Sequence, residues 1–366
     1  MNTSFFKKIQ LIVFIAFLSG LVNAKTEIYN IVHANNPKIQ YTGRIDFSKP
    51  LSPKITWPGT YIKANFTGSF LALTLDDQKG QNYFNVIVDN NIDNPVILNC
   101  EKGEKIYFIT NGLNDSTHSL WLFKRTEGEE GYTLFKNLIL NQNGNLIEPP
   151  ARPPLKIELI GDSITCGMSN EAYGKKPGEG AAVKNNFLTY GAITARDLNA
   201  DFTCIAKSGI GIMISWFNFT MPDYFNQLDA TGTNGQKWDF KKWQPDVVVI
   251  NLFQNDSWLV NRLKPVPTDE QRVQAYYNFL KTVRGKYPKA FIICTLGSMD
   301  ATKPGSKWPG YISKAVSEFR EKNSDNKIDT LFFDYTGFNP HPLVKDHKRN
   351  AKKLTKFIRE KVLSIK

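Results

Sequence analysis

The pattern of apolar residues changes at a run of prolines between residues 149 and 154. Before this run, from about residue 40 to residue 146, short stretches alternate apolar and polar side chains between turn residues. After it, the apolar stretches become nearly continuous and helical patterns separate them. Four prolines in six residues favour a stiff, extended connector. The sequence therefore predicts two structural units, at residues 25–148 and 155–366, joined by a linker at 149–154.

The first unit contains many short alternating stretches and no helical pattern. Alternation places apolar side chains on one face of a strand and polar side chains on the other. This pattern is typical of an all-β jelly roll or β-sandwich. The expected strands are residues 61–66, 70–75, 83–88, 105–110, 119–124 and 132–140.

The second unit alternates continuous apolar stretches with helical patterns. Continuous apolarity indicates strands that are buried on both faces, as in a parallel sheet covered by helices. We therefore predict a three-layer α/β/α domain, with its functional site at the carboxyl ends of the strands. The expected strands are residues 156–160, 202–206, 246–252, 290–296 and 330–333, and the expected helices include 187–198, 270–286 and 311–322.

Residues 1–24 have the composition of a targeting segment. Lys7 and Lys8 precede an apolar run at residues 9–18, and Val22-Asn23-Ala24 places small residues at a cleavage position. The apolar run is shorter than the ~20 residues that span a bilayer, although an uncleaved anchor is an alternative. We expect a cleaved signal peptide and a secreted or periplasmic mature chain without a membrane anchor.

The composition argues against several classes of protein. The chain has 46 Lys and Arg residues against 34 Asp and Glu residues. However, no basic block carries the interleaved aromatic residues of a nucleic-acid module. We therefore expect no nucleic-acid partner. The four cysteines and four histidines show no metal-ligand spacing, so neither a metal nor a cofactor is expected. Cys204 and Cys294 lie in apolar stretches, where a buried free thiol is the simplest interpretation.

Three polar motifs follow three consecutive strands of the predicted parallel sheet. Gly161-Asp162-Ser163 ends the first strand, Ser208-Gly209-Ile210-Gly211 ends the second, and Asn255 follows the third. A serine on a tight turn after a buried strand exposes its hydroxyl, and glycines let a backbone N–H approach a ligand closely. Each motif by itself is equally compatible with an ordinary turn.

A histidine completes this set near the end of the chain. His341 precedes the expected terminal helix, and Pro342 suits the first helical position, so we expect His341 to lie near the strand ends. His347 is a second candidate base, but its position six residues further on favours a packing role.

Together, these four blocks resemble the SGNH (GDSL-like) hydrolase superfamily, and with the β-domain the chain resembles carbohydrate esterase family 2, which includes acetylxylan esterases. The resemblance implies that Ser163 attacks the ester carbonyl and that His341 is its base. It also implies an oxyanion hole made by the N–H groups of Ser163 and Gly209 and the Asn255 amide. Gly209 is preferred over Gly211 on the family pattern alone.

Three positions depart from that pattern. The family usually has Asp three residues before the histidine, where this chain has Phe338. Asn339 can orient the imidazole but brings no charge, so we expect a Ser–His dyad whose histidine is oriented by a backbone carbonyl. Asp334 and Asp346 are the alternatives. Phe253 replaces a usual glycine, which predicts a narrowed or reshaped oxyanion region. Pro340 replaces a frequent tryptophan beside the histidine.

Aromatic residues follow the second and third strand ends. Trp216 and Trp258 are candidates for stacking on a sugar ring, and core packing is the alternative for both. We expect a serine esterase that removes acetyl groups from an exported polysaccharide or oligosaccharide. A lipase or thioesterase on the same scaffold is one rival, and a large apolar acyl channel would favour it. A carbohydrate-binding protein with a degenerate hydrolase domain is the other.

Overall fold

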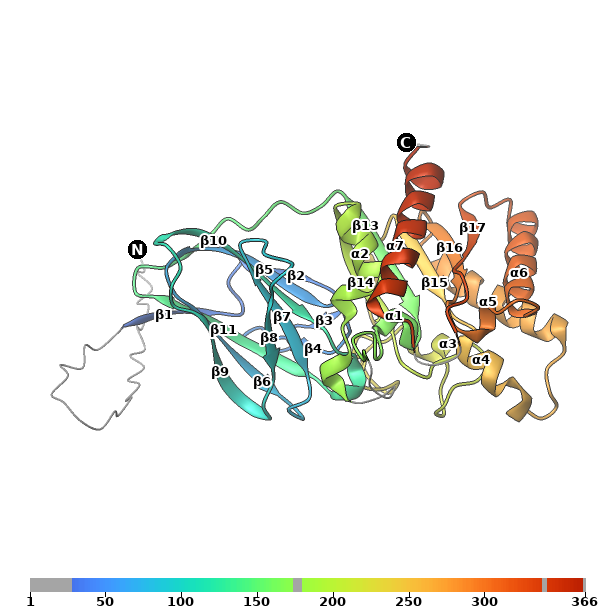
Figure 1. The fold of residues 1–366 in the computed structure, drawn as a ribbon, viewed down its shortest axis with the longest axis horizontal. Coiled ribbons are helices and arrows are strands. Elements are labelled where there is room, and N and C mark those ends of the chain that lie inside the picture. The colour runs from blue at the N-terminus through green and yellow to red at the C-terminus, as the bar shows by residue number, and fades with distance from the viewer. Residues whose placement is uncertain (1–27, 174–179, 338–340, 365–366) are drawn as a thin grey trace.

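The computed structural model describes residues 28–173, 180–337 and 341–364. The predicted signal peptide at residues 1–24 lies outside the described residues. Figure 1 shows two units side by side along the long axis, a β-sandwich and an α/β domain. Their strands belong to separate sheets.

The β-sandwich consists of two six-stranded antiparallel sheets. The first sheet contains β1 (Tyr29–His33), β3 (Ile45–Asp46), β4 (Lys54–Ile55), β6 (Leu71–Asp77), β9 (Gly103–Thr110) and β11 (Thr133–Asn141). The second contains β2 (Gln40–Thr42), β5 (Tyr61–Gly68), β7 (Tyr83–Val88), β8 (Val96–Asn99), β10 (Ser116–Lys124) and β12 (Leu146–Ile147).

The alternating pattern of the sequence forms the core of this sandwich. Along β5, Ile62, Ala64 and Phe66 are buried while the residues between them are partly exposed. These side chains pack against Leu73 and Leu138 of the opposite sheet in one apolar cluster. Inward apolar residues from both sheets are what a sandwich requires, and the predicted all-β fold is confirmed.

The second unit is built on a five-stranded parallel sheet. Its strands follow the order β14 (Ala200–Ala206), β13 (Leu155–Gly161), β15 (Val247–Asn251), β16 (Phe291–Leu296) and β17 (Ile328–Phe332). The strand order reverses at β13: the next strand in the sequence, β14, lies on one side of it, and the following strand, β15, lies on the other. In sheets of this kind, sites form beside such a reversal, at the carboxyl ends of the strands.

Helices cover both faces of this sheet, which confirms the α/β/α prediction. On one face, α5 (Asp269–Lys286) and α6 (Trp308–Asn323) pack on each other and on the sheet. On the other, α2 (Tyr190–Asp197) packs beside α7 (Val344–Ile358). The shorter helices are α1 (Ser163–Cys166), α3 (Met221–Tyr224) and α4 (Gln254–Leu259).

Single turns complete the described elements. The 3-10 turns are Gly128–Glu130, Ala181–Val183, Asn186–Leu188, Phe240–Lys242, Val260–Arg262 and Asp300–Thr302, and Arg359–Leu363 is a π-helical turn. Within residues 28–173, 180–337 and 341–364, no helix combines the length and apolarity needed to cross a membrane.

The terminal helix begins later than the sequence predicts. Leu343 is its N-cap, in an extended conformation, and its N–H donates to the Asp346 carboxylate at 3.0 Å. The first turn therefore starts at Val344, and the placement of Pro342 at the first helical position was wrong. His341 lies two residues before the N-cap, whereas the sequence predicts it directly before the first helical residue.

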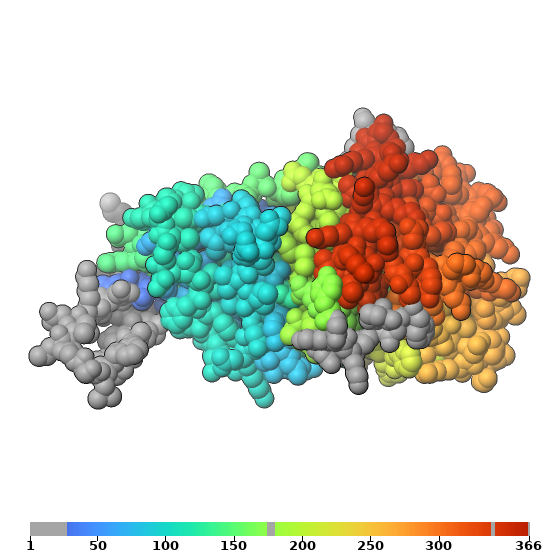
Figure 2. Space-filling model, in the orientation of Figure 1, coloured from blue at the N-terminus to red at the C-terminus, as the bar shows by residue number. Residues whose placement is uncertain are grey.

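Buried polar contacts and a shared apolar cluster join the two units. Tyr61 and Phe123 of the sandwich lie in the same cluster as Phe202 of the parallel sheet. Arg44 of the sandwich is buried 3.5 Å from Glu158 of β13. Figure 2 shows the two units in contact over a broad surface. The sandwich is therefore fixed against the α/β domain.

Candidate active site

Ser163 begins a single helical turn at the carboxyl end of β13. Asp162 is the N-cap of this turn, and its carboxylate accepts the Ile164 N–H at 3.0 Å. Gly167 ends the turn with a φ of 84°, a conformation that favours glycine. A Cβ at Gly161 would lie 2.0 Å from the Thr165 hydroxyl. The Gly-Asp-Ser motif thus specifies a tight strand-to-helix turn that presents the Ser163 hydroxyl.

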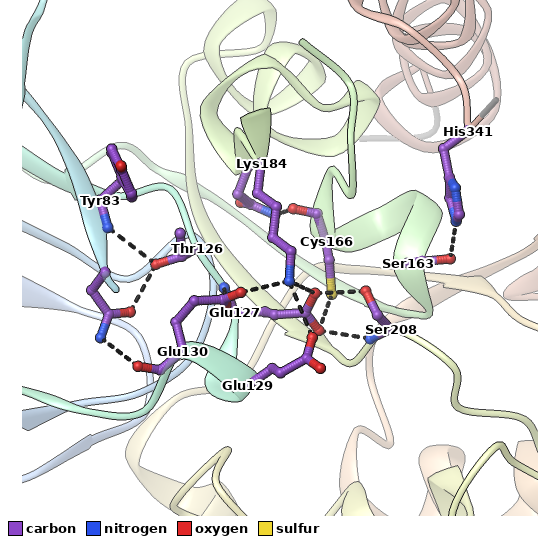
Figure 3. A network of polar contacts seen from close by, with 12 residues as sticks. Tyr83, Thr126, Glu127, Glu129, Glu130, Ser163, Cys166, Lys184, Ser208 and His341 are labelled. Atoms are coloured by element: carbon purple, nitrogen blue, oxygen red, sulfur yellow. Dashed lines mark hydrogen bonds and ion pairs between the residues drawn. The ribbon is translucent and has the colours of Figure 1, made fainter. Parts of the chain in front are cut away.

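The structure brings Ser163 and His341 together. The Ser163 Oγ lies 2.9 Å from the Nε2 of His341 (Figure 3). Burial lowers the pKa of His341 to about 4, although the negative charge of Glu127 acts in the opposite direction. A neutral imidazole can accept the serine proton, so this pair has the geometry of a nucleophile and its base.

The second imidazole nitrogen has no acceptor among the described residues. His341 Nδ1 is buried without a hydrogen-bond partner there. Asp346 accepts from Leu343 and Arg349, and Asp334 pairs with Lys353 at 3.0 Å. Neither carboxylate therefore orients His341. Asn339, the predicted orienting residue, lies outside the described residues, as do Phe338 and Pro340.

The loop after β14 places Gly209 at the site. Its φ of 83° requires a residue without a Cβ, because an added Cβ would crowd Trp216 and Phe217 at 3.3 Å. The Gly211 N–H already donates to the Ser215 hydroxyl at 3.0 Å. By contrast, the backbone N–H groups of Ser163 and Gly209 have no acceptor within the described part of the chain. This difference favours Gly209 over Gly211 as an oxyanion donor.

Asn255 lies in the first turn of α4, beside the same loop. Its Nδ2 donates to the Ile210 carbonyl at 2.9 Å and approaches the Asp162 carboxylate at 3.4 Å. Its Oδ1 accepts from the Trp216 indole at 3.1 Å. The bond to Asp162 is the longer of the two, and it would have to break before that N–H could donate to a substrate oxygen.

The carboxylate of Asp256 anchors the loop that carries Gly209. Asp256 accepts the backbone N–H groups of Ile212, Met213 and Ile214, at 3.0, 2.6 and 3.3 Å. Burial raises the pKa of Asp256 to about 6, against the effect of these donors. The residue after Asn255 therefore fixes the loop that carries Gly209.

Phe253 does not narrow the oxyanion region. Its side chain is fully buried and packs against Tyr276 and Trp308, with ring centroids 5.0 and 5.1 Å away. Its φ of 93° explains why a glycine suits this position. Phe253 adopts this backbone conformation, and its ring lies in the core of the α/β domain. The predicted narrowing of the oxyanion region was therefore wrong.

The two candidate tryptophans differ in what they can contact. Trp216 is 54% exposed and hydrogen bonded to Asn255. Trp258 is partly buried, and its indole donates to both oxygens of Asp300, at 2.9 and 2.8 Å. Trp216 therefore presents a partly exposed ring beside the site, with the Arg262 guanidinium over it at 4.7 Å from the ring centroid, whereas the Trp258 N–H is already bound.

His347 has a packing role. It is fully buried and its Nδ1 accepts the Tyr190 N–H at 3.2 Å, while its ring stacks on the Tyr190 ring. Burial lowers its pKa to about 3. This placement agrees with the preferred sequence interpretation and removes His347 as a candidate base.

The sequence did not reveal a charged cluster behind the site. Glu127 and Glu130 of the β-sandwich and Lys184 of the α/β domain are buried together, and Glu127 contacts Ser208 (Figure 3). Glu127 and Ser208 are separated by 81 residues. No local pattern marks such a contact, and only the juxtaposition of the two units shows it.

The described residues contain no group of His, Cys, Asp and Glu side chains that could hold a metal ion. All four cysteines are buried and free. This finding agrees with the interpretation of Cys204 and Cys294 as buried thiols. The reactive groups that the site does present are a hydroxyl, an imidazole, backbone N–H groups and an amide.

Comparison with known families assigns both units. Residues 41–150 match the carbohydrate esterase 2 N-terminal family, and residues 157–330 match the GDSL-like lipase/acylhydrolase family. The fold and the site thus define the class of the protein, a carboxylic ester hydrolase with a GDSL-like α/β/α domain.

Individual relatives narrow this class. A family two carbohydrate esterase from Clostridium thermocellum, solved with cellohexaose, is 33% identical, with a TM-score of 0.80 over 88% of this chain and 99% of that one. The cellulase/esterase CelE of Acetivibrio thermocellus is 34% identical over 90% of this chain, which spans 40% of that protein. An acetylxylan esterase/glucomannan deacetylase of Cellvibrio japonicus is 26% identical over 94% of this chain and 95% of that protein. The chain belongs to family 2 of the carbohydrate esterases.

Proposed function

We propose that this protein is a serine esterase that removes acetyl groups from polysaccharides or oligosaccharides through a Ser–His dyad. The 2.9 Å contact between Ser163 Oγ and His341 Nε2 is the observation that carries this proposal. The relative from Cellvibrio japonicus, an acetylxylan esterase/glucomannan deacetylase, supports the choice of substrate class.

In the first half of the reaction, His341 accepts the hydroxyl proton while Ser163 Oγ bonds to the acetyl carbonyl carbon. The carbonyl oxygen becomes an oxyanion, which the N–H groups of Ser163 and Gly209 and the Asn255 amide stabilise. The intermediate collapses, His341 returns the proton to the sugar oxygen, and the deacetylated sugar leaves. Ser163 now carries the acetyl group.

In the second half, His341 accepts a proton from water, and the hydroxide equivalent attacks the acetyl carbonyl. The same donors stabilise the second oxyanion. Acetate leaves, and the proton on His341 returns to Ser163 Oγ. Each half needs only one proton acceptor and one set of oxyanion donors, so a dyad suffices.

The hollow beside His341 is polar rather than apolar. It has a volume of about 810 Å³, and Ser163 and the proposed oxyanion donors are not among the residues that line it. Its wall is largely polar and charged, formed by Tyr335, Thr336, Gly337, Leu343, Lys345, Asp346 and Arg349. A lipase or thioesterase needs an apolar channel for its acyl chain. Trp216 lies next to the proposed oxyanion donors, and a sugar would stack on the part of its ring that Arg262 leaves uncovered.

Hydrolysis of p-nitrophenyl acetate by the wild type and by Ser163→Ala tests the proposal. We expect the variant to lose activity by at least about 10³-fold, since it lacks the nucleophile. Acetylated xylan and glucomannan oligosaccharides should then release acetate with the wild type. Equal background turnover by the two proteins would favour a carbohydrate-binding protein, and preference for long acyl esters would favour a lipase.

We also propose that the mature chain is exported without residues 1–24. The basic residues, apolar run and small-residue cleavage position of this segment support the proposal. The N-terminal sequence of the protein recovered from its native host checks it. A mature chain that starts near residue 25 is expected, and a retained Met1 would contradict the proposal.

A further inference from the structure

A carboxylate from the β-sandwich reaches into the back of the candidate active site. Glu127 follows β10 and directly precedes the 3-10 turn Gly128–Glu130. Its side chain is 1% exposed, and the neighbouring Lys184 is 6% exposed. Figure 3 shows Glu127 between Lys184 and Ser208, on the side of Ser208 that faces the sandwich. The carboxylate is thus buried where the two units meet.

Both oxygens of Glu127 are bound by the residue that precedes Gly209. The Ser208 N–H donates to Oε2 at 2.7 Å, and the Ser208 hydroxyl donates to Oε1 at 2.6 Å. Two short bonds to a carboxylate fix both the backbone and the side chain of Ser208. The peptide bond that follows carries the Gly209 N–H, so its orientation depends on this anchor.

Other contacts restrain the two peptide bonds that follow the Gly209 N–H. The Gly209 carbonyl accepts the backbone N–H of Trp216 at 3.0 Å, and the Ile210 carbonyl accepts from the Asn255 amide at 2.9 Å. Those contacts come from the α/β domain itself. Glu127 is the anchor that the sandwich contributes to this loop.

Glu127 is ionised in this position. Burial alone would raise its pKa, but Lys184 and the two bonds from Ser208 outweigh burial and lower it to about 2. The same charge raises the pKa of His341 against the effect of burial, while the Lys184 ammonium lowers it. An imidazolium forms at His341 in the first step of the proposed reaction. Its stabilisation by Glu127 is therefore partly offset by Lys184, and the main effect of Glu127 on the site is its contact with Ser208.

We propose that Glu127 is a positioning residue of this esterase, and that the β-sandwich thereby completes the oxyanion hole by fixing Ser208 and the Gly209 N–H. This inference rests on the proposed function. It makes the sandwich a part of the catalytic unit, in addition to any contact with glycan.

A purely structural role for Glu127 is the alternative. Other buried pairs already join the two units, among them Arg44 with Glu158 and Arg125 with Glu171. None of these side chains contacts Ser208 or Gly209. Glu130 provides the closest comparison, because it pairs with Lys184 at 2.5 Å in the same cluster. Within the described residues Glu130 has no contact with the Gly209 loop itself. It accepts the Glu127 backbone N–H at 3.1 Å, a bond that the amide oxygen of Gln can also accept, so Glu130→Gln serves as the structural control.

The experiment compares Glu127→Gln with Glu130→Gln in the full chain, using p-nitrophenyl acetate and thermal unfolding. Both substitutions place an amide against the Lys184 ammonium. The pKa of Glu127 is lowered, whereas burial and the Glu127 charge raise the pKa of Glu130, so Glu127→Gln should lower Tm by more, and kcat is compared at a temperature where both variants are folded. Only Glu127→Gln should lower kcat, by about 10- to 100-fold with KM within about threefold, because a misaligned donor acts on the transition state. Glu130→Gln should keep kcat within about twofold of the wild type.

Ser208→Ala provides a second route that keeps Glu127, Glu130 and Lys184 in place. It removes one of the two bonds to Glu127 and should lower kcat by about 3- to 10-fold. In the Ser208→Ala background, Glu127→Gln should cost less than it does alone, since the two residues act through one contact. Additive losses would contradict this path.

The outcomes separate the two proposals. Equal kcat losses in Glu127→Gln and Glu130→Gln, or a wild-type kcat in Glu127→Gln, would overturn the positioning role. If Glu127→Gln does not fold, an unchanged kcat in Ser208→Ala overturns it instead. If the wild type is no more active than Ser163→Ala, the proposed esterase function fails first.

Discussion

The two sides of Ser163 are held very differently. On the oxyanion side, Asp256 accepts three backbone N–H groups, Asn255 accepts from Trp216, and Glu127 binds Ser208 through both oxygens. On the histidine side, the one hydrogen bond of the imidazole that the described residues show is the 2.9 Å contact with Ser163. Buried carboxylates therefore support the oxyanion donors rather than the base.

This asymmetry has a physical reason. An oxyanion hole stabilises charge only if its donors already point at the oxygen, so rigidity there lowers the barrier directly. A base needs hydrogen-bond reach and a suitable pKa, and burial has already made His341 neutral near pH 7. One backbone carbonyl that orients the imidazole, as the sequence predicts, would then be enough on the histidine side. The predictions below test this comparison, from the largest expected effect to the smallest.

The first prediction concerns the histidine side. His341→Ala should lower kcat by at least about 10³-fold, because no other described imidazole reaches Ser163. Asn339→Ala should cost less than about 10-fold if a backbone carbonyl orients the imidazole. Steady-state kinetics on p-nitrophenyl acetate measure both variants. Equal losses would show that the Asn339 side chain is the orienting group.

The second prediction concerns the oxyanion side. Asn255→Ala should lower kcat by about 10²–10³-fold with little change in KM, the usual cost of losing one oxyanion donor. Asn255 also accepts from Trp216, so Trp216→Phe serves as the control that removes this contact alone. If Trp216→Phe loses as much kcat as Asn255→Ala, the amide acts by holding the indole and does not donate to the oxyanion.

The smallest effect is a shift in pH dependence. His341 must be neutral to accept the serine proton, and burial lowers its pKa to about 4. As far as His341 sets the acid limb, activity should therefore persist below the ordinary histidine value of about 6.5 and decline toward about 4. Protonation of Asp256, whose pKa burial raises to about 6, should add a smaller loss by weakening its bonds to the Gly209 loop. A profile of kcat/KM on p-nitrophenyl acetate, corrected for unfolding by fluorescence, measures this limb. A limb at or above 6.5 would contradict a buried, neutral base.

Sequence patterns predicted the fold well because burial imposes them. The alternation along β5 and the continuous apolar run of β15 each reflect how many faces of a strand are covered. The Gly-Asp-Ser turn could be predicted equally well, because Gly161 and Gly167 occupy positions where a side chain would clash or strain the backbone.

The rest of the site depends on contacts that no local pattern encodes. The start of α7 was misplaced because Asp346 caps Leu343, and a side-chain cap outweighed the preference of proline for the first turn. Phe253 looked like an obstruction because its left-handed backbone, which turns the ring into the core, leaves no mark in the sequence. Glu127 was missed because its partner lies 81 residues away in the other unit.

Direct detection of the acetyl-enzyme tests the central claim, the pairing of Ser163 with His341, most closely. The wild type is mixed with p-nitrophenyl acetate, quenched in acid during turnover, digested and analysed by mass spectrometry. We predict an added acetyl group on the peptide that contains Ser163, and its absence in His341→Ala treated in the same way. Turnover with the acetyl group on another residue, or with no acetylated peptide in a burst-phase quench, would contradict the account.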